Sequence, residues 1–110
     1  MSTPIKLVAG DSKPNITVTL TDASTAAAVD LSDANTTVRV YFRAAGTTTT
    51  LSTITCSKQD AENGVVEFDF SGGVLDDLDA GMYEGEIEID FNGDTHTVFD
   101  VIKFRLRDEF

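Results

Sequence analysis

Apolar and polar residues alternate through much of the chain, and the pattern is clearest over residues 83–91. Tyr83, Ile87, Ile89 and Phe91 fall on one face of this segment, with Gly85 at the remaining place. The opposite face carries only acidic side chains, which are Glu84, Glu86, Glu88 and Asp90. A strict period of two over this length predicts a β-strand with one buried face and one solvated face.

The same alternation predicts the other strands. They are expected over residues 5–9, 15–21, 36–43, 51–58, 65–70 and 95–107, with a brief extended piece at 29–31. Asn92-Gly93, between alternating segments, is a strong hairpin signal. Residues 74–79 are expected to form one helical turn or an irregular crossover between sheets. Seven or eight short strands without a long helical pattern predict a single domain, residues 1–110, folded as an antiparallel β-sandwich.

The residues just before the clearest strand indicate a particular kind of β-sandwich. In immunoglobulin-like sandwiches, a tyrosine near the start of strand F bonds back to the upstream corner, two residues before a disulfide cysteine. Here Tyr83 follows Asp79 and Gly81, and Gly85 stands in the place of that cysteine. Cys56 is the only cysteine, so no disulfide can form within the chain. We therefore expect an all-β, immunoglobulin-like sandwich with a tyrosine corner and no disulfide.

Charge and cysteine content exclude several classes of function. The formal net charge of the 110 residues is −11, which argues against a nucleic-acid partner or an anionic membrane surface. No stretch reaches the length of a membrane span, and the first residues lack an apolar signal-type run. The single Cys56 also fits folding in a reducing cytoplasm. Its simplest role is that of a small buried side chain; a reactive thiol would need a basic neighbour, and Lys58 alone is nearby.

The acidic row on the clearest strand could be a metal site, a catalytic site or a charge ladder. In an immunoglobulin-like sheet this strand lies between strands C and G. Five of the eight basic residues fall on outward positions of those two neighbours: Arg39, Arg43, Lys103, Arg105 and Arg107. Cross-strand pairs of opposite charge contribute about 0.2–1 kcal/mol each. We therefore interpret the row as a ladder of ion pairs.

Other constellations are incomplete. Residues 90–94 begin like a calcium-binding loop, but Thr95 and Val101 stand where glycine and glutamate are needed. His96 is the only histidine and completes neither a zinc site nor a catalytic triad. Three acids that could hold a divalent ion loosely are first of all part of a polar crossover: Asp76, Asp77 and Asp79. The sequence thus predicts no enzymatic activity, no cofactor and no metal site.

Four segments together resemble a known family. IKLVAGDSKPNITVTLTD, VRVYFRAAG, LDAGMYEGEIEI and VIKFRLRDEF are similar to the N-terminal immunoglobulin-like domain of phage baseplate upper proteins of the BppU type. The likeness runs over nearly the whole chain and is most specific at residues 80–86 and 103–110. It implies a non-enzymatic virion protein, made in the host bacterial cytoplasm and packed in multiple copies against other phage structural proteins of a tail, neck or head.

The end of the chain departs from that family. The family domain usually precedes further assembly or receptor-binding segments, whereas this chain stops at Phe110. The difference favours a small stand-alone adaptor or decoration protein. The alternative is a free-standing immunoglobulin-like binding module, such as an adhesin or a carbohydrate binder.

Three apolar residues are candidate contacts with the particle. Phe110 is large and has no strand beyond it, and Phe99 and Val101 fall on the face opposite Ile102. A single buried face would leave both of them exposed. A β-bulge near Asp100 is the alternative, because it would flip the register and return both side chains to the core.

Overall fold

The computed structural model describes residues 4–22, 25–98 and 101–108. Nine strands and one short 3-10 helix, η1 (Ala61–Asn63), form within these residues. The strands are β1 (Ile5–Val8), β2 (Ile16–Thr19), β3 (Thr36–Ala44), β4 (Ser52–Thr55), β5 (Ser57–Asp60), β6 (Val65–Phe68), β7 (Gly81–Phe91), β8 (Asp94–Thr97) and β9 (Ile102–Arg107). Within the described ranges, no helix has the length and apolar character needed to cross a membrane.

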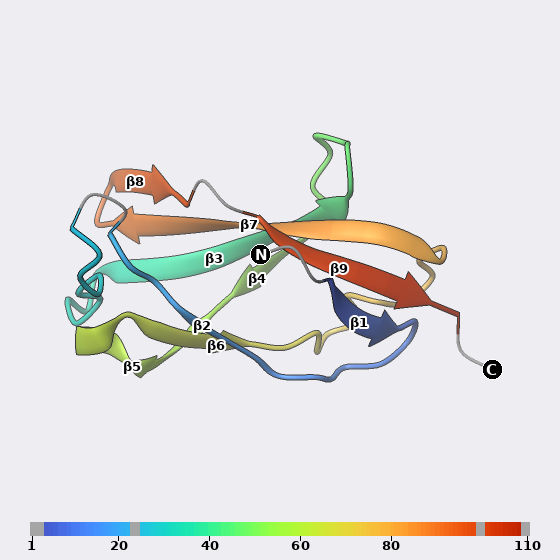
Figure 1. Ribbon diagram of the computed structural model, residues 1–110, viewed down its shortest axis with the longest axis horizontal. Helices are drawn as coiled ribbons and strands as arrows, with labels where there is room; N and C mark the ends of the chain where they lie inside the picture. Colours follow the sequence, from blue (N-terminus) through green and yellow to red (C-terminus); the bar gives the residue numbers. More distant parts are fainter. Residues whose placement is uncertain (1–3, 23–24, 99–100, 109–110) are drawn as a thin grey trace.

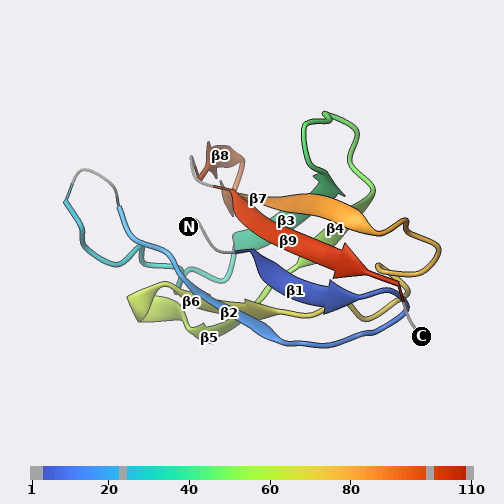
Figure 2. The ribbon, with the colours of Figure 1, turned by 45° about the vertical axis from the view of Figure 1, so that its right-hand side comes forward.

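The strands form two sheets (Figure 1). The large sheet has the order β1-β9-β7-β3-β4, with β8 also paired to β7, and the small sheet has the order β2-β6-β5. Neighbours are antiparallel except β1 and β9, which run parallel. Figure 2 shows the small sheet lying beneath the large one. This arrangement confirms the predicted all-β sandwich without a disulfide, and among the described strands the parallel β1–β9 pair is the one departure from the expected antiparallel pairing.

Nine strands are present where seven or eight were expected, because two predicted strands are each divided. Residues 51–58 were predicted as one strand. In the structure β4 belongs to the large sheet and β5 to the small sheet, and the chain changes sheets at Cys56. The Cys56 amide donates a hydrogen bond to the carbonyl of Val38, 2.9 Å away, and its side chain is buried. The sequence left open which face of this segment is buried; Ile54 and Cys56 lie inward.

The last predicted strand, residues 95–107, is also divided. Thr97 of β8 pairs with Glu88, whereas Ile102 of β9 pairs with Gly85. The two registers therefore differ by two residues along β7. The extended piece predicted at residues 29–31 forms no strand in the structure, although Leu31 is fully buried.

The core lies between the sheets and is richest in aromatic rings at the end where β7 begins. The ring of Phe42 stacks on Tyr83 with centroids 5.3 Å apart, and it also contacts Phe70 and Phe104. Gly85 lies inward among these rings. A Cβ atom there would sit 2.9 Å from Val40 Cγ1 and 3.2 Å from Phe104 Cε2, so the neighbours occupy the space that a larger residue would need.

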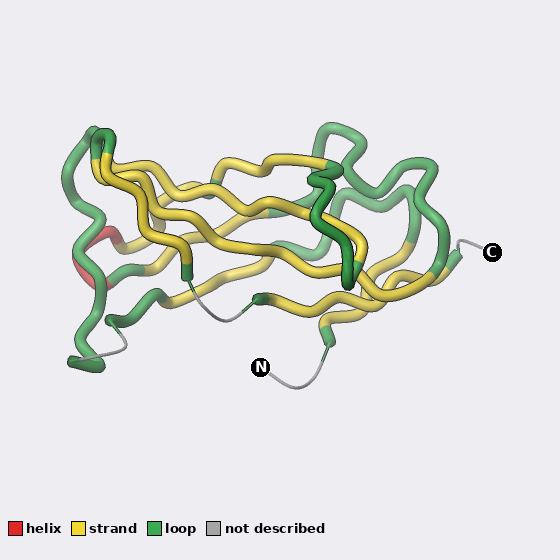
Figure 3. Tube along the Cα trace, turned by 90° about the horizontal axis from the view of Figure 1, so that it is seen from above, coloured by secondary structure: helices red, strands yellow, loops and turns green. Residues whose placement is uncertain are grey.

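The opposite end of β7 closes in the predicted hairpin. Asn92 and Gly93 adopt positive φ angles of 57° and 108°, which suit a tight turn between twisted strands. The Gly93 amide donates a hydrogen bond to Asp90 Oδ1 over 2.8 Å. Figure 3 shows the strands running along the long axis of the molecule, with loops gathered at its two ends.

Candidate functional site

Tyr83 forms the contact expected of a tyrosine corner. Its hydroxyl donates a hydrogen bond to the Asp79 carbonyl, 2.6 Å away, and only 7% of the residue is exposed. Burial, and next the charge of Asp79, raise the pKa of the phenol. Gly81 has a φ of 154°, a value that disfavours other residues. This hydrogen bond therefore ties the crossover that precedes β7 to the start of that strand. The Tyr83 hydroxyl is bonded to the backbone of the protein itself.

The outer face of the large sheet, called the striped face below, carries rows of alternating charge. Its acidic row on β7 consists of Glu84, Glu86, Glu88 and Asp90. Arg43 Nε contacts Glu84 Oε1 at 2.9 Å, and this hydrogen bond raises the pKa of Arg43. Arg39 lies 3.8 Å from Glu88 and 3.7 Å from Asp90. The β3 half of the predicted ladder is therefore present.

Tyr41 joins the same side of the ladder. Its hydroxyl donates a hydrogen bond to Glu88 Oε1 over 2.9 Å. This bond, followed by burial, raises the pKa of Tyr41. Arg43 also lies 3.7 Å from Glu86. Each carboxylate of the row thus has a cation or a hydroxyl on β3 within reach.

The β9 half of the predicted ladder is only partly present, because one of its cations stands opposite the acidic row without a close ion pair. Lys103 is opposite Glu84 in register and Arg105 is opposite Met82, but in the described part of the chain neither cation comes within 4.0 Å of the acidic row. Arg107 lies next to Val8 of β1. Arg105 does not reach the acidic row because β9 pairs with only the first part of β7, and β8 takes its place farther along.

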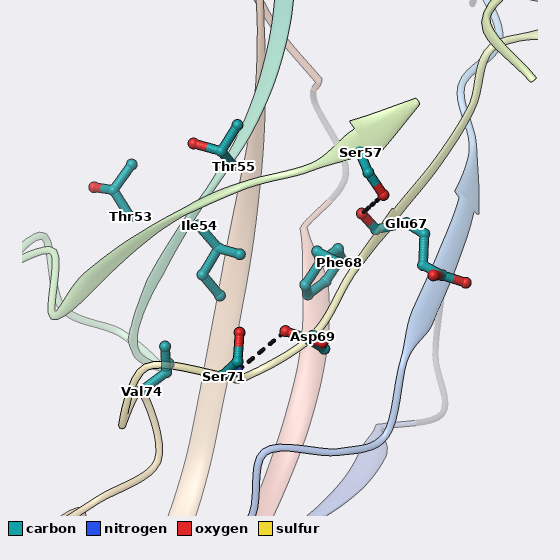
Figure 4. Close-up of a pocket in the computed structure, with 9 residues that line it drawn as sticks. All are labelled: Thr53, Ile54, Thr55, Ser57, Glu67, Phe68, Asp69, Ser71 and Val74. Atoms are coloured by element: carbon teal, nitrogen blue, oxygen red, sulfur yellow. Dashed lines mark hydrogen bonds between the residues drawn. The ribbon is translucent and has the colours of Figure 1, made fainter. Parts of the chain in front are cut away.

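A groove lies between the β4–β5 segment and the chain that follows β6. Its volume is about 310 Å³. Its lining comprises Thr53, Ile54, Thr55, Ser57, Glu67, Phe68, Asp69, Ser71 and Val74. Figure 4 shows Ile54 and Phe68 directed inward with Ser57 and Ser71 nearby, Thr53 and Thr55 projecting from the other side of β4, and the Glu67 carboxylate directed toward β2. Sequence reasoning missed this groove, because it forms only where the edges of the two sheets separate.

Two polar groups of the groove are held by local hydrogen bonds. Ser57 Oγ donates to the Glu67 carbonyl at 3.2 Å. The Ser71 amide donates to Asp69 Oδ1 at 3.1 Å, and hydrogen bonds from Ser71 lower the pKa of Asp69. The lining residues include no histidine or cysteine. The groove can therefore offer hydrogen bonds and apolar contact to a ligand, but no nucleophile paired with a base.

The predicted contact residues are only partly visible. Phe99 and Phe110 lie outside the described residues, and Val101 is half-buried. The registers of β8 and β9 differ by two residues, an even number, so Val98 and Ile102 both point inward and pack against the core. Residues 99 and 100 lie outside the described residues, so the alternative of a β-bulge near Asp100 stays a prediction.

Potential catalytic and metal-binding residues are dispersed. Among the described residues, no three His, Cys, Asp or Glu side chains are placed to hold a metal ion. His96 is exposed on β8, and Asp90 Oδ1 accepts the hairpin amide. Burial raises the pKa of Cys56 to about 12, so its thiol stays protonated and unreactive near neutral pH.

Comparisons with known proteins give no match, so the interpretation of the surface rests on the residues described above. No family model matches the chain, and no curated protein is significantly similar to it. The two surface features with organised chemistry are the striped face and the groove. The first presents charge over a broad area and the second presents hydroxyl groups over a small one, and both suit non-covalent contacts.

Proposed function

We propose that this chain is a non-enzymatic structural protein of a bacteriophage particle and acts through protein–protein contacts. Its place would be that of a tail, baseplate, neck or head adaptor or decoration protein, present in multiple copies among other phage structural proteins. It would bind neither nucleic acid nor membrane. We expect it to be made in the host bacterial cytoplasm and to end in the virion.

One observation carries this proposal. The two segments with the most specific resemblance to the baseplate upper proteins, residues 80–86 and 103–110, are distant in sequence. In the structure β7 and β9 pair directly, from Gly81 opposite Leu106 to Gly85 opposite Ile102. The paired segments also contain the Tyr83 corner. Their adjacency supports a shared structural unit behind the resemblance.

The charge distribution supports contacts with protein. A net charge of −11 opposes binding to phosphate backbones and keeps free copies soluble. The striped face nevertheless holds rows of both signs on a broad sheet surface. Surfaces of this kind select partners by complementary charge.

The test is mass spectrometry of purified phage particles, performed on the phage whose genome encodes this chain. We expect the protein at a fixed stoichiometry relative to known structural proteins after density-gradient purification. Its presence in the infected-cell lysate but absence from gradient-purified particles would overturn the proposal. As a control for adsorption, recombinant protein is added to a lysate, and the washed fraction from that lysate is analysed in the same way.

A second experiment tests the predicted contact residues. A chain lacking residues 108–110 is purified, its fold is checked by circular dichroism, and it is offered to particles that lack the protein. We expect a folded domain that no longer incorporates, and Phe110→Ala alone is expected to weaken incorporation. Normal incorporation of the truncated chain would remove the C-terminus from the contact, and loss of folding would assign it to the core.

The groove favours a second candidate function, a free-standing immunoglobulin-like binding module. Serine hydroxyls and the Asp69 carboxylate stand beside apolar side chains in its lining, as suits a small polar ligand. A glycan array probed with the purified protein tests this function. Binding that Ser57→Ala and Ser71→Ala abolish would support it, whereas no binding to any glycan would count against a carbohydrate-binding module.

A further inference from the structure

The striped face differs in charge from the rest of the molecule. Six of the eight basic residues lie on it: Lys6, Arg39, Arg43, Lys103, Arg105 and Arg107. Among the described residues, the acidic side chains on it are the four of the β7 row. The described part of the face therefore has a formal charge of +2, within a chain whose net charge is −11.

Charges of the two signs also form neighbouring rows within the face. The acidic row shares the cations Arg39 and Arg43, which leaves four carboxylates to two guanidinium groups. On the other side Lys6, Lys103 and Arg105 are exposed, and we call these three residues the basic patch. The patch lies toward the end of the sheet where β7 begins, because Arg105 is opposite Met82 and Lys6 is opposite Arg105.

A face with this distribution is complementary to itself. Two copies can be related by a two-fold axis that lies in the plane of contact, midway between the basic patch and the acidic row. This rotation places the acidic row of one copy against the basic patch of the other. The same operation makes the reciprocal contact, as an isologous interface requires. The geometry points to a second copy of this chain as the occupant of the striped face.

The area of the face suits a weak dimer. The strands of the large sheet contain 38 residues in total. With strands about 4.8 Å apart and about 3.4 Å per residue, the face covers roughly 600 Å². Standard interfaces bury about 800 Å² per partner, so this contact falls at the small end of specific interfaces.

An exposed apolar side chain lies at the end of the acidic row, beside the basic patch. Met82 is 41% exposed and opposite Arg105, at the start of the strand that carries the acidic row. Removing such a side chain from water favours association without requiring a charged partner. The face therefore offers an apolar contact beside the two complementary charged regions.

The net charge predicts an unusual dependence on salt. Copies with a charge of −11 repel one another over long distances, and moderate salt screens that repulsion to about 10 Å at 0.1 M. The close row-to-patch pairs persist at this concentration and are weakened near 1 M. We therefore expect dimerisation to be strongest at intermediate ionic strength. This association goes beyond the proposed function and holds whether or not the protein belongs to a virion.

Analytical ultracentrifugation of the purified chain and two charge-reversal variants tests the inference. Lys103→Glu with Arg105→Glu makes the face acidic, and Glu86→Lys with Glu88→Lys makes it basic. Each variant alone is expected to be monomeric, while their equimolar mixture forms a heterodimer. Lys103→Glu alone is expected to weaken wild-type dimerisation roughly tenfold or more. Lys13→Glu, the same change outside the striped face, is the matched control and leaves dimerisation within about twofold.

Cross-linking of the wild-type chain keeps the test decisive if a variant fails to fold. A carbodiimide joins lysine to carboxylate without a spacer, and mixing unlabelled and 15N-labelled protein identifies links between copies. Links from Lys103 or Lys6 to Glu84 or Glu86 of another copy support the interface. A monomer at every salt concentration, or intermolecular links confined to residues outside the striped face, overturns it.

Discussion

The two ends of β7 follow one alternating pattern but have different surroundings. Tyr83 near its start is 7% exposed and stacks on Phe42, whereas Phe91 at its end is 37% exposed. Both side chains occupy the same face of the strand by parity. The start is packed against the rings contributed by several elements, and the end is paired with β8, whose four residues are all exposed.

This difference separates the direction of a side chain from its burial. Alternation determines which face of a strand a residue occupies. Burial also requires the second sheet to cover that position, and the strands of the small sheet have only four residues each. The small sheet cannot cover all of an 11-residue strand. The hairpin end of β7 therefore has an apolar face without a complete core beneath it.

The largest expected effect is the loss of an aromatic ring at the corner end. Phe104→Ala removes a fully buried ring that contacts Phe42 and Phe70, and we expect a loss of about 3–5 kcal/mol in the free energy of unfolding. Phe91→Ala, at the other end of the comparison, is expected to cost less than about 1 kcal/mol. Urea denaturation measures both. Equal losses would show that the two ends are buried alike.

Gly85 tests how tightly the middle of β7 is packed. In Gly85→Ala the new methyl group would overlap Val40 and crowd Phe104, and we expect a loss of about 1–3 kcal/mol. The control is a double-mutant cycle with Val40→Ala, which removes the nearer contact. A favourable coupling energy is expected, and purely additive losses would mean that Val40 is not the obstacle.

The next largest loss of stability is expected from removing the Tyr83 hydroxyl. Tyr83→Phe keeps the stacked ring but leaves the Asp79 carbonyl without its donor, so we expect a loss of about 1–3 kcal/mol. Tyr41→Phe removes a hydroxyl from the solvated face and is expected to cost less than about 1 kcal/mol. Thermal unfolding compares the two variants. An unchanged melting temperature for Tyr83→Phe would count against the corner as a stabilising contact.

Cys56 reports through its thiol whether water enters the core next to the half of β7 that leads into the hairpin. Its amide bonds to Val38, which pairs with Ile89, and burial raises its pKa from 9.0 to about 12. Between these values the unfolded chain releases a proton that the folded chain retains, so stability falls as pH rises above about 9. The loss is about 1.4 kcal/mol at pH 10.

Cys56→Ala is the control for this pH dependence, because it keeps every other titrating group. The difference between the two stability curves measured by urea denaturation from pH 7 to 10.5 isolates the thiol. Parallel curves for the two proteins would show that water reaches Cys56 in the folded state. The region of dry core on the hairpin side would then be smaller than the structure shows.

Much of the fold could be predicted because the alternation is regular. The pattern also explains what the prediction missed at Cys56. Ile54 and Cys56 keep the same parity while the chain passes from one sheet to the other. The inner faces of both sheets point to one core, so a change of sheet leaves no mark on the pattern. The same reasoning applies to the last predicted strand, whose division preserves the inward parity of Val98 and Ile102.

The surface features were less predictable because they depend on register. The pairs between β3 and the acidic row follow from nine paired positions along β7. Lys103 reaches a position opposite Glu84, whereas Arg105 lies opposite Met82, because β9 adjoins only the first part of β7. No local pattern marks the groove, whose walls come from separate sheet edges. Phe99 and Phe110 stay predictions as contact residues.

The parallel pairing of β1 with β9 has a mechanical consequence. The chain enters β1 at one end of this two-stranded ribbon and leaves β9 at the other end, because both strands run in the same direction. A force that pulls these two segments apart along the strands loads the hydrogen bonds between them in shear, so that they share the load. A hairpin such as β7–β8 pulled open at its free ends breaks one bond after another. The sandwich is therefore built to resist tension applied through its first and last strands.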